Sequence, residues 1–103
     1  MMAGYLRLYL TAVDPADLDE MRRLFHDDVQ PPFTGIDGCL HLELVVSVEK
    51  NAGGLVEAGI VSRWASVAAM DAAFGSRGVV EGIVRFRELL RQEPVIKVFE
   101  ISE

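Results

Sequence analysis

The chain contains two histidines, His26 and His41, the only side chains whose unperturbed pKa allows easy proton exchange near neutral pH. His41 lies in an alternating segment two residues before Glu43, whose carboxylate could orient the imidazole on the same strand face. His26 follows Phe25 at the edge of an apolar helical stripe, where it could reach the mouth of a pocket. Both are candidate catalytic residues, and each has an alternative role as a surface or interface contact.

Other side chains with reactive groups favour structural roles. Tyr5, Arg7 and Tyr9 share one face of the first alternating segment, which favours packing at an interface. Cys39 has no basic neighbour in the sequence and begins a strand, so we expect an inert, small hydrophobic residue. The sequence shows no Ser-His-Asp spacing, no phosphate-binding glycine loop and no cluster of metal ligands. None of these three common kinds of site is predicted.

Length and charge limit the classes of protein to which this chain can belong. Its 103 residues are enough for one domain, spanning 1–103, and the formal net charge of −6 argues against nucleic acid or an anionic membrane as partner. A single cysteine cannot form an internal disulfide, and no apolar run reaches the length of a membrane span. The first residues, MMAGYLRLYLTAV, do not have the pattern of a secretory signal. We therefore expect a cytoplasmic protein.

Alternation and helix-capping patterns predict the element order β-α-β-β-α-β, the ferredoxin-like α+β arrangement. In this fold, two helices cover one face of a four-stranded antiparallel sheet. The predicted strands are 5–13, 39–48, 55–64 and 94–103. The first helix is predicted to begin after Asp14 and to end before Pro31; the second begins after Ser66, breaks at the glycines of 75–78 and resumes to Gln92.

Two helices on one face leave the other face of the sheet uncovered. The stripe Leu6, Leu8 and Leu10 is the expected helix-facing side of the first strand. The opposite face then gathers Tyr9, Arg7, His41 and Glu43 with other residues, a mixed surface with both charge signs. A face-to-face homodimer would bury this surface. The alternative is a solvated sheet face with ordinary cross-strand pairs.

Two segments carry a resemblance to a known family: DGCLHLEL at 37–44, and VSRWASVAAMDAAF at 61–74. With this element order and length, the chain resembles the antibiotic biosynthesis monooxygenase-like family of the dimeric α+β barrel superfamily. The resemblance implies a homodimer whose two sheets close into a barrel. It also implies a small-molecule pocket between sheet and helices in each subunit.

The resemblance further implies a cofactor-independent monooxygenase acting on a small aromatic, quinol or polyketide-type substrate. Trp64 matches the tryptophan of the family's pocket, and we expect Phe74, Leu42 and Ile60 to line that pocket with it. On the predicted faces no polar side chain of the sheet points under the helices, and 70–80 contains no histidine, which disfavours haem degradation. An isomerase or cyclase, or a dimer that binds a ligand or serves a structural role without catalysis, remains an alternative.

Overall fold

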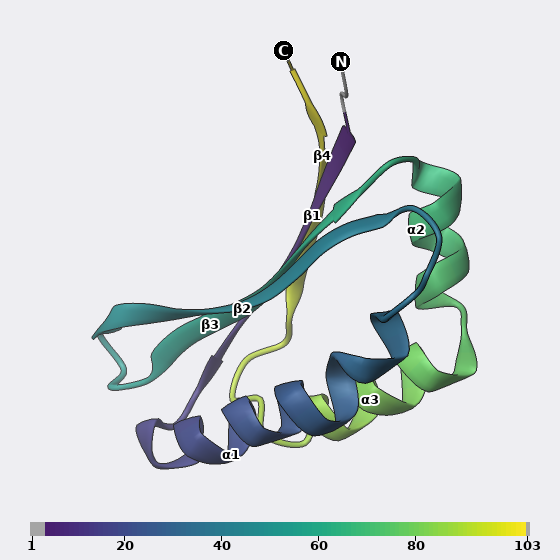
Figure 1. Cartoon of the computed structure of the whole chain (residues 1–103). Helices are drawn as coiled ribbons and strands as arrows, with labels where there is room; N and C mark the ends of the chain where they lie inside the picture. The colour runs from purple at the N-terminus through teal and green to yellow at the C-terminus, as the bar shows by residue number, and fades with distance from the viewer. Residues whose placement is uncertain (1–3, 103) are drawn as a thin grey trace.

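The computed structural model describes residues 4–102, which form a four-stranded sheet with helices packed on one face (Figure 1). The strands are β1 (Gly4–Val13), β2 (Cys39–Lys50), β3 (Val56–Trp64) and β4 (Val95–Ile101), and the α-helices are α1 (Leu18–Leu24), α2 (Val67–Phe74) and α3 (Arg77–Arg87). The strand order is β2-β3-β1-β4, and each neighbouring pair is antiparallel. The predicted ferredoxin-like α+β fold is confirmed.

The segment between β1 and β2 is helical from Pro15 to Phe33 but changes its winding along the way. A 3₁₀ turn (Pro15–Asp17) leads into α1, and the helix continues as a π-helical turn (Phe25–Val29). There the Gln30 N–H donates to the carbonyl of Phe25, five residues back, at 2.8 Å. A second 3₁₀ turn (Pro31–Phe33) follows, because proline cannot donate to the preceding turn. The predicted start and end of this helix are confirmed, and the π-helical turn is an added finding.

The predicted break in the second helical segment separates α2 from α3. The Ser66 hydroxyl caps α2 by accepting the Ala69 N–H at 3.1 Å, and α2 ends at Gly75. The α3 helix packs closely on the π-helical turn at Gly82. A Cβ atom at Gly82 would lie 2.5 Å from the backbone oxygen of Asp28, so this contact requires glycine.

The side chains of β1 face the other way from the prediction. On the helix-facing side, Tyr9 is 2% exposed and its ring makes an edge contact with Phe86 of α3, with centroids 6.2 Å apart. The Arg7 guanidinium lies 3.7 Å from the ring centre of Phe74 in α2. Three rows of paired residues cross this side from β4 to β2: Glu100–Tyr5–Trp64–Cys39, Val98–Arg7–Ser62–Leu42 and Ile96–Tyr9–Ile60–Leu44.

The predicted dimer surface of Tyr9, Arg7, His41 and Glu43 is therefore wrong for its two β1 residues. A shift of one residue in a strand moves every side chain to the opposite face. Here Val13, fully buried and paired with Val56, fixes the odd-numbered residues of β1 toward the helices. The even-numbered leucines lie on the other side of the sheet.

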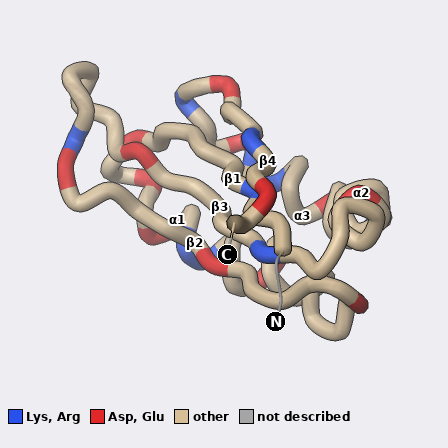
Figure 2. Tube along the Cα trace, turned by 90° about the horizontal axis from the view of Figure 1, so that it is seen from above, with Lys and Arg blue, Asp and Glu red and all other residues tan. Residues whose placement is uncertain are grey.

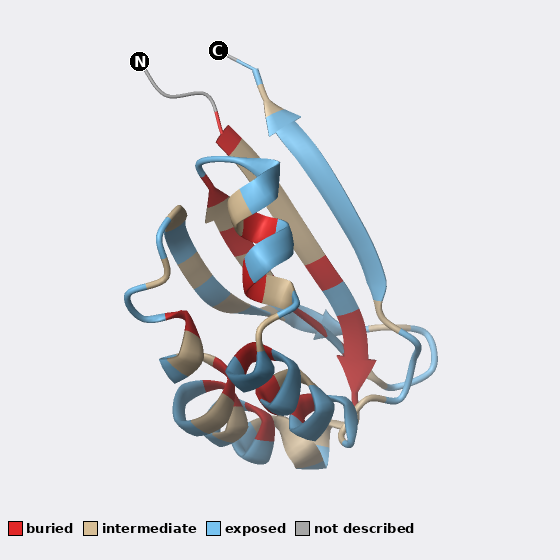
Figure 3. Ribbon diagram, turned by 90° about the vertical axis from the view of Figure 1, so that its right-hand side faces the viewer, coloured by how far each residue is buried: buried red, intermediate tan, exposed pale blue. Residues whose placement is uncertain are grey.

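That other side, which we call the open face, is covered by no helix of the described residues. Its three rows from β4 to β2 are Phe99–Leu6–Arg63–His41, Lys97–Leu8–Val61–Glu43 and Val95–Leu10–Gly59–Val45. Phe99 is 46% exposed and Val95 is 52% exposed, so the face presents large apolar side chains to solvent. Figure 3 shows the pale blue of exposed residues along most of β4.

Charged residues are distributed around the molecule. Figure 2 shows basic and acidic positions interspersed along the helices and strands. Among the described helices, none is both long and apolar enough to cross a membrane.

Candidate functional site

Trp64, the predicted pocket residue, is packed in the core between sheet and helices. Its side chain is 0% exposed, and its indole N–H donates to the Ser62 hydroxyl at 2.9 Å. The rings of Phe33 and Phe74 lie 6.2 Å and 5.7 Å from the Trp64 ring, centroid to centroid. Since the one polar atom of Trp64 already has a partner within the chain, a ligand oxygen would have to compete with Ser62 for it.

Arg7 brings a positive charge into the same layer. It comes from the centre of β1, opposite Ser62 on β3, and its guanidinium lies over the ring of Phe74. Partial burial lowers the pKa of Arg7 from its ordinary value, and the charge of Tyr9 acts in the opposite direction. Arginine remains protonated at any physiological pH. The layer between sheet and helices therefore holds a half-buried cation with an aromatic ring on one side.

Tyr9 places a hydroxyl group beside this cation, two residues along the same strand face. The hydroxyl oxygen is buried and has no hydrogen-bond partner among the described residues. Burial raises the pKa of Tyr9, while the nearby charges of Arg87 and Arg7 lower it and Glu93 raises it further. The group thus stays protonated at neutral pH and is free to donate a hydrogen bond. An unsatisfied buried hydroxyl costs about 1–3 kcal/mol, so it needs an explanation.

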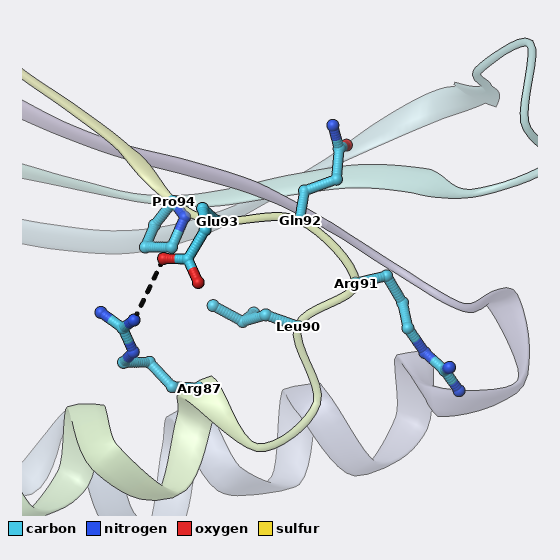
Figure 4. A pocket seen from close by; sticks show the side chains of 6 residues that line it. All are labelled: Arg87, Leu90, Arg91, Gln92, Glu93 and Pro94. Atoms are coloured by element: carbon cyan, nitrogen blue, oxygen red, sulfur yellow. Dashed lines mark hydrogen bonds and ion pairs between the residues drawn. The ribbon is translucent and has the colours of Figure 1, made fainter.

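A pocket of about 290 Å³ lies where α3 ends and the chain leads into β4. Figure 4 shows Arg87, Leu90 and Glu93 pointing toward one another, with Arg91 and Gln92 directed away. The side chains of Arg87 and Glu93 form an ion pair at 3.3 Å. Neither Tyr9 nor Arg7 lines this pocket, although the charges of Arg87 and Glu93 act on the pKa of the Tyr9 hydroxyl.

The helix-facing residues of β1 and β4 form a strip that the helices leave partly open. Ile96 pairs with Tyr9 and Val98 pairs with Arg7, and the two β4 residues are 48% and 45% exposed. We call Arg7, Tyr9, Ile96 and Val98 the β1–β4 strip. It combines an apolar floor with one cation and one hydrogen-bond donor, the usual composition of a site for a small organic molecule.

The two predicted catalytic histidines lie elsewhere. His41 is on the open face, where its Nε2 atom is 3.1 Å from a carboxylate oxygen of Glu43, so the predicted pairing is present. His26 is on the π-helical turn, its Nδ1 atom 3.3 Å from the amide oxygen of Gln30. His26 and Leu42 line a pocket of about 300 Å³ between this turn and β2. The structure therefore brings His26 together with Leu42, and neither histidine with Trp64.

Predicted and unpredicted residues meet at Phe74. It was expected to line the pocket, and it contacts both Trp64 and Arg7. Arg7 and Tyr9 were assigned to the interface and were missed as site residues. One signal was present in the sequence: they share their strand face with Val13, next to the helix start, where burial is expected. The thiol of Cys39 has its pKa raised by burial, in agreement with a packing role.

Comparisons with known proteins give a match in structure only. No family model matches the sequence, and no curated protein matches it. A conserved protein from Methanosarcina mazei Go1 superposes with a TM-score of 0.81 at 16% identity, covering 98% of this chain and 95% of that one. A protein from Caulobacter crescentus CB15, described as a candidate antibiotic biosynthesis monooxygenase, has a TM-score of 0.76 at 19% identity, covering 99% and 92%.

A protein from Deinococcus radiodurans with the same description has a TM-score of 0.72 at 18% identity, covering 96% of this chain and 93% of that one. The chain has the fold of the antibiotic biosynthesis monooxygenases. The predicted resemblance is thus confirmed at the level of the fold. At these identities, the chemistry has to be argued from this chain's own residues.

Proposed function

We propose that this protein is a monooxygenase of the antibiotic biosynthesis type that oxidises a small hydroxylated aromatic molecule at the β1–β4 strip. The observation that carries the proposal is the Tyr9 hydroxyl, which is buried and has no partner among the described residues. Burial raises the pKa of this hydroxyl, and the charges of Arg87 and Arg7 act in the opposite direction. A substrate oxygen would provide the missing acceptor. The shared fold with proteins named antibiotic biosynthesis monooxygenases supports this class of reaction.

The proposed reaction draws its electrons from the substrate, so it needs dioxygen as the only co-reactant. A phenol loses its proton to solvent, and the resulting anion is electron-rich enough to reduce dioxygen. For an anthrone-like substrate, a bond forms between the ring carbon and one oxygen atom, which becomes a carbonyl. The second oxygen atom leaves as water with the two hydrogens that this carbon loses.

The described residues contribute electrostatics and binding. Tyr9 donates a hydrogen bond to the substrate oxyanion, and Arg7 and Arg87 favour the ionised over the neutral phenol. Arg87 is half-exposed and forms a surface ion pair with Glu93, so its side chain is free to reorient toward a bound anion. Ile96 and Val98 contact the ring and exclude water from one side of it.

The experiment is oxygen uptake with hydroquinone and with anthrone, each corrected for spontaneous oxidation in the absence of protein. Removing one hydrogen-bond donor from a developing oxyanion lowers the rate by about 10²-fold, so Tyr9→Phe is expected to lose activity by about that factor. The matched control is Tyr5→Phe, which removes a hydroxyl from the same strand face. No uptake by the wild type with either substrate, or equal rates for wild type and Tyr9→Phe, would contradict the proposal.

A second candidate function is an isomerase or cyclase in which His26 moves a proton. The observation favouring it is the pocket beside β2, which is lined by the His26 imidazole, in contact with Gln30, together with the apolar side chains of Leu42 and Leu44. Proton exchange or isomerisation of a substrate without oxygen consumption, lost in His26→Gln, would favour this reaction over the monooxygenase. Binding without turnover would leave a ligand-binding protein.

We also propose that the active unit is a homodimer formed through the open face. The corrected face is more apolar than the predicted one, because Leu6, Leu8 and Leu10 lie on it beside Val61 and Phe99. His41 and Glu43 remain at its edge on β2, where charged groups can pair across the interface. Burial of such a face stabilises a small domain whose own core is limited.

Sedimentation equilibrium tests the dimer. Wild type is expected at twice the chain mass of 11.4 kDa. Leu8→Asp places a charge at the centre of the open face and is expected to give a monomer. Val84→Asp, on an exposed position of α3, is the control that should leave the mass unchanged. A monomeric wild type would overturn the interface.

A further inference from the structure

Arg7 is a cation without an anion. Among the described residues, no carboxylate lies within 4.0 Å of the Arg7 guanidinium. The arginines that form ion pairs are half-exposed or more. No hydrogen bond from its guanidinium to the described residues is present either. The guanidinium carbon lies 3.7 Å from the ring centre of Phe74. Its N–H groups, which lie in the guanidinium plane, are left for another acceptor.

The carboxylate best placed to neutralise Arg7 from within the chain does not do so. Glu100 pairs with Tyr5 on the neighbouring row of the same sheet side, two residues along each strand from the Val98–Arg7 pair. Its side chain is exposed and is not within ion-pair distance of Arg7. Partial removal of a cation from water is unfavourable unless an anion compensates for it. An external anion at Arg7 would provide this compensation.

The strip presents the cation and the hydroxyl from one face of one strand. The Cα atoms of Arg7 and Tyr9 are two residues apart, about 6.6 Å along the strand, and both side chains leave the sheet on the helix-facing side. The guanidinium fork matches a carboxylate, to which it can donate two parallel hydrogen bonds. A ring that spans the two residues lies against Ile96 and Val98.

We infer that Arg7 binds a carboxylate of the substrate, so that the protein selects hydroxylated aromatic carboxylates over neutral phenols. The inference rests on the proposed function for the identity of the site, and it adds the substrate class. The carboxylate pairs with Arg7 while the ring hydroxyl at the other end accepts the hydrogen bond of Tyr9. The same orientation is imposed on every substrate, because Phe74 holds the guanidinium in place.

Binding can be measured separately from turnover. Isothermal titration calorimetry without oxygen compares 2,5-dihydroxybenzoate with its neutral isostere 2,5-dihydroxybenzamide. Wild type is expected to bind the carboxylate at least about tenfold more tightly than the amide, the range expected for a charge-assisted pair. Arg7→Met, which keeps an unbranched side chain over Phe74, is expected to lose this preference and to bind the amide as wild type does. Arg77→Met removes an exposed arginine of α3 and is the control for net charge.

Each result separates the inference from the proposed function. Equal affinity of wild type for the carboxylate and the amide, or an unchanged preference in Arg7→Met, would overturn the role of Arg7 even if oxygen uptake were observed. An Arg7-dependent preference without oxygen uptake would keep the carboxylate site and remove the monooxygenase. The comparison of carboxylate with amide in the wild type does not depend on the folding of a variant, and Arg7→Met then assigns the preference to Arg7. Glu100→Gln, which removes the nearest competing carboxylate, is expected to retain or increase the preference.

Discussion

Replacing Tyr9 with phenylalanine should make the protein more stable while it loses activity. The substitution removes one buried oxygen atom that has no partner among the described residues and keeps the ring that packs on Phe86. An unsatisfied buried polar group costs about 1–3 kcal/mol, and the lower end applies where the surroundings can relax. We therefore expect Tyr9→Phe to raise the free energy of unfolding by about 1 kcal/mol.

Urea unfolding provides the measurement, and the single tryptophan, Trp64, provides the signal because it is buried in the folded state. With a denaturant slope of about 1–2 kcal/mol per molar for a domain of this size, the urea midpoint should rise by about 0.5–1 M. Protein concentration is held equal for both proteins, since a dimer is stabilised by mass action. Tyr5→Phe, which alters a hydroxyl on the same strand face, should move the midpoint much less.

The pH dependence gives a second readout with a defined sign. Burial raises the pKa of Tyr9 above its ordinary value of 10.0, so the folded state favours the neutral phenol. The corresponding stability is present below about pH 10 and is lost as the pH rises through the folded-state pKa. Tyr9→Phe lacks this loss, so its advantage over wild type should widen above pH 10. A variant less stable than wild type at neutral pH would show that the hydroxyl has a partner, and would refute the reasoning.

Two further predictions concern the helices that cover the site. Gly82→Ala should destabilise the protein by about 1–3 kcal/mol in the same urea assay, because the added Cβ atom would lie 2.5 Å from the Asp28 carbonyl oxygen. Gly53→Ala, in an exposed turn, is the control and should change stability little. Ser66→Ala should lower the free energy of unfolding by about 1 kcal/mol, because α2 loses the cap on the Ala69 N–H. Ser66→Asp keeps an acceptor at the cap and should retain most of the wild-type stability, so equal urea midpoints for the two variants would contradict the capping role.

The order of the elements and the starts of the helices follow from local signals in the sequence, whereas α3 ends at Arg87 and not at the predicted Gln92. Asp14 before Pro15 begins the first helix, Ser66 begins the second, and Gly75 separates α2 from α3 as predicted. These signals act over three or four neighbouring residues, so they can be identified in the sequence without knowledge of the tertiary contacts. On β2, His41 and Glu43 lie on the face opposite the helices as predicted, whereas the register shift between Cys39 and His41 places Cys39 against the core and leaves Leu40 45% exposed.

The direction of β1 was not predictable in the same way. Both faces of this strand are plausible as core: one carries Leu6, Leu8 and Leu10, and the other carries aromatic rings with Val13. Hydrophobicity favours the leucines, yet the helices pack on Tyr9 and on Arg7 through Phe74. A pattern that shows apolar residues on both faces of a strand does not say which face the helices cover.

The candidate site shares this limit. Its residues were visible in the sequence as types, but their meeting depends on the face of β1 and on the pairing of β1 with β4, which joins positions about ninety residues apart. The π-helical turn was equally inaccessible, because its extra residue leaves the apolar spacing of the helix almost unchanged. Both features are set by tertiary contacts.

The contact between Gly82 and the π-helical turn has a consequence for how this sequence can diverge. The widened turn brings the Asp28 carbonyl toward α3, and only a residue without a side chain fits beneath it. Loss of one residue from 25–30 would return the turn to ordinary helical winding and remove the demand for glycine. The residue at position 82 and the length of this segment should therefore vary together among related proteins. Relatives with the extra residue in the turn should have glycine at this position of α3, and relatives without it should not need glycine there.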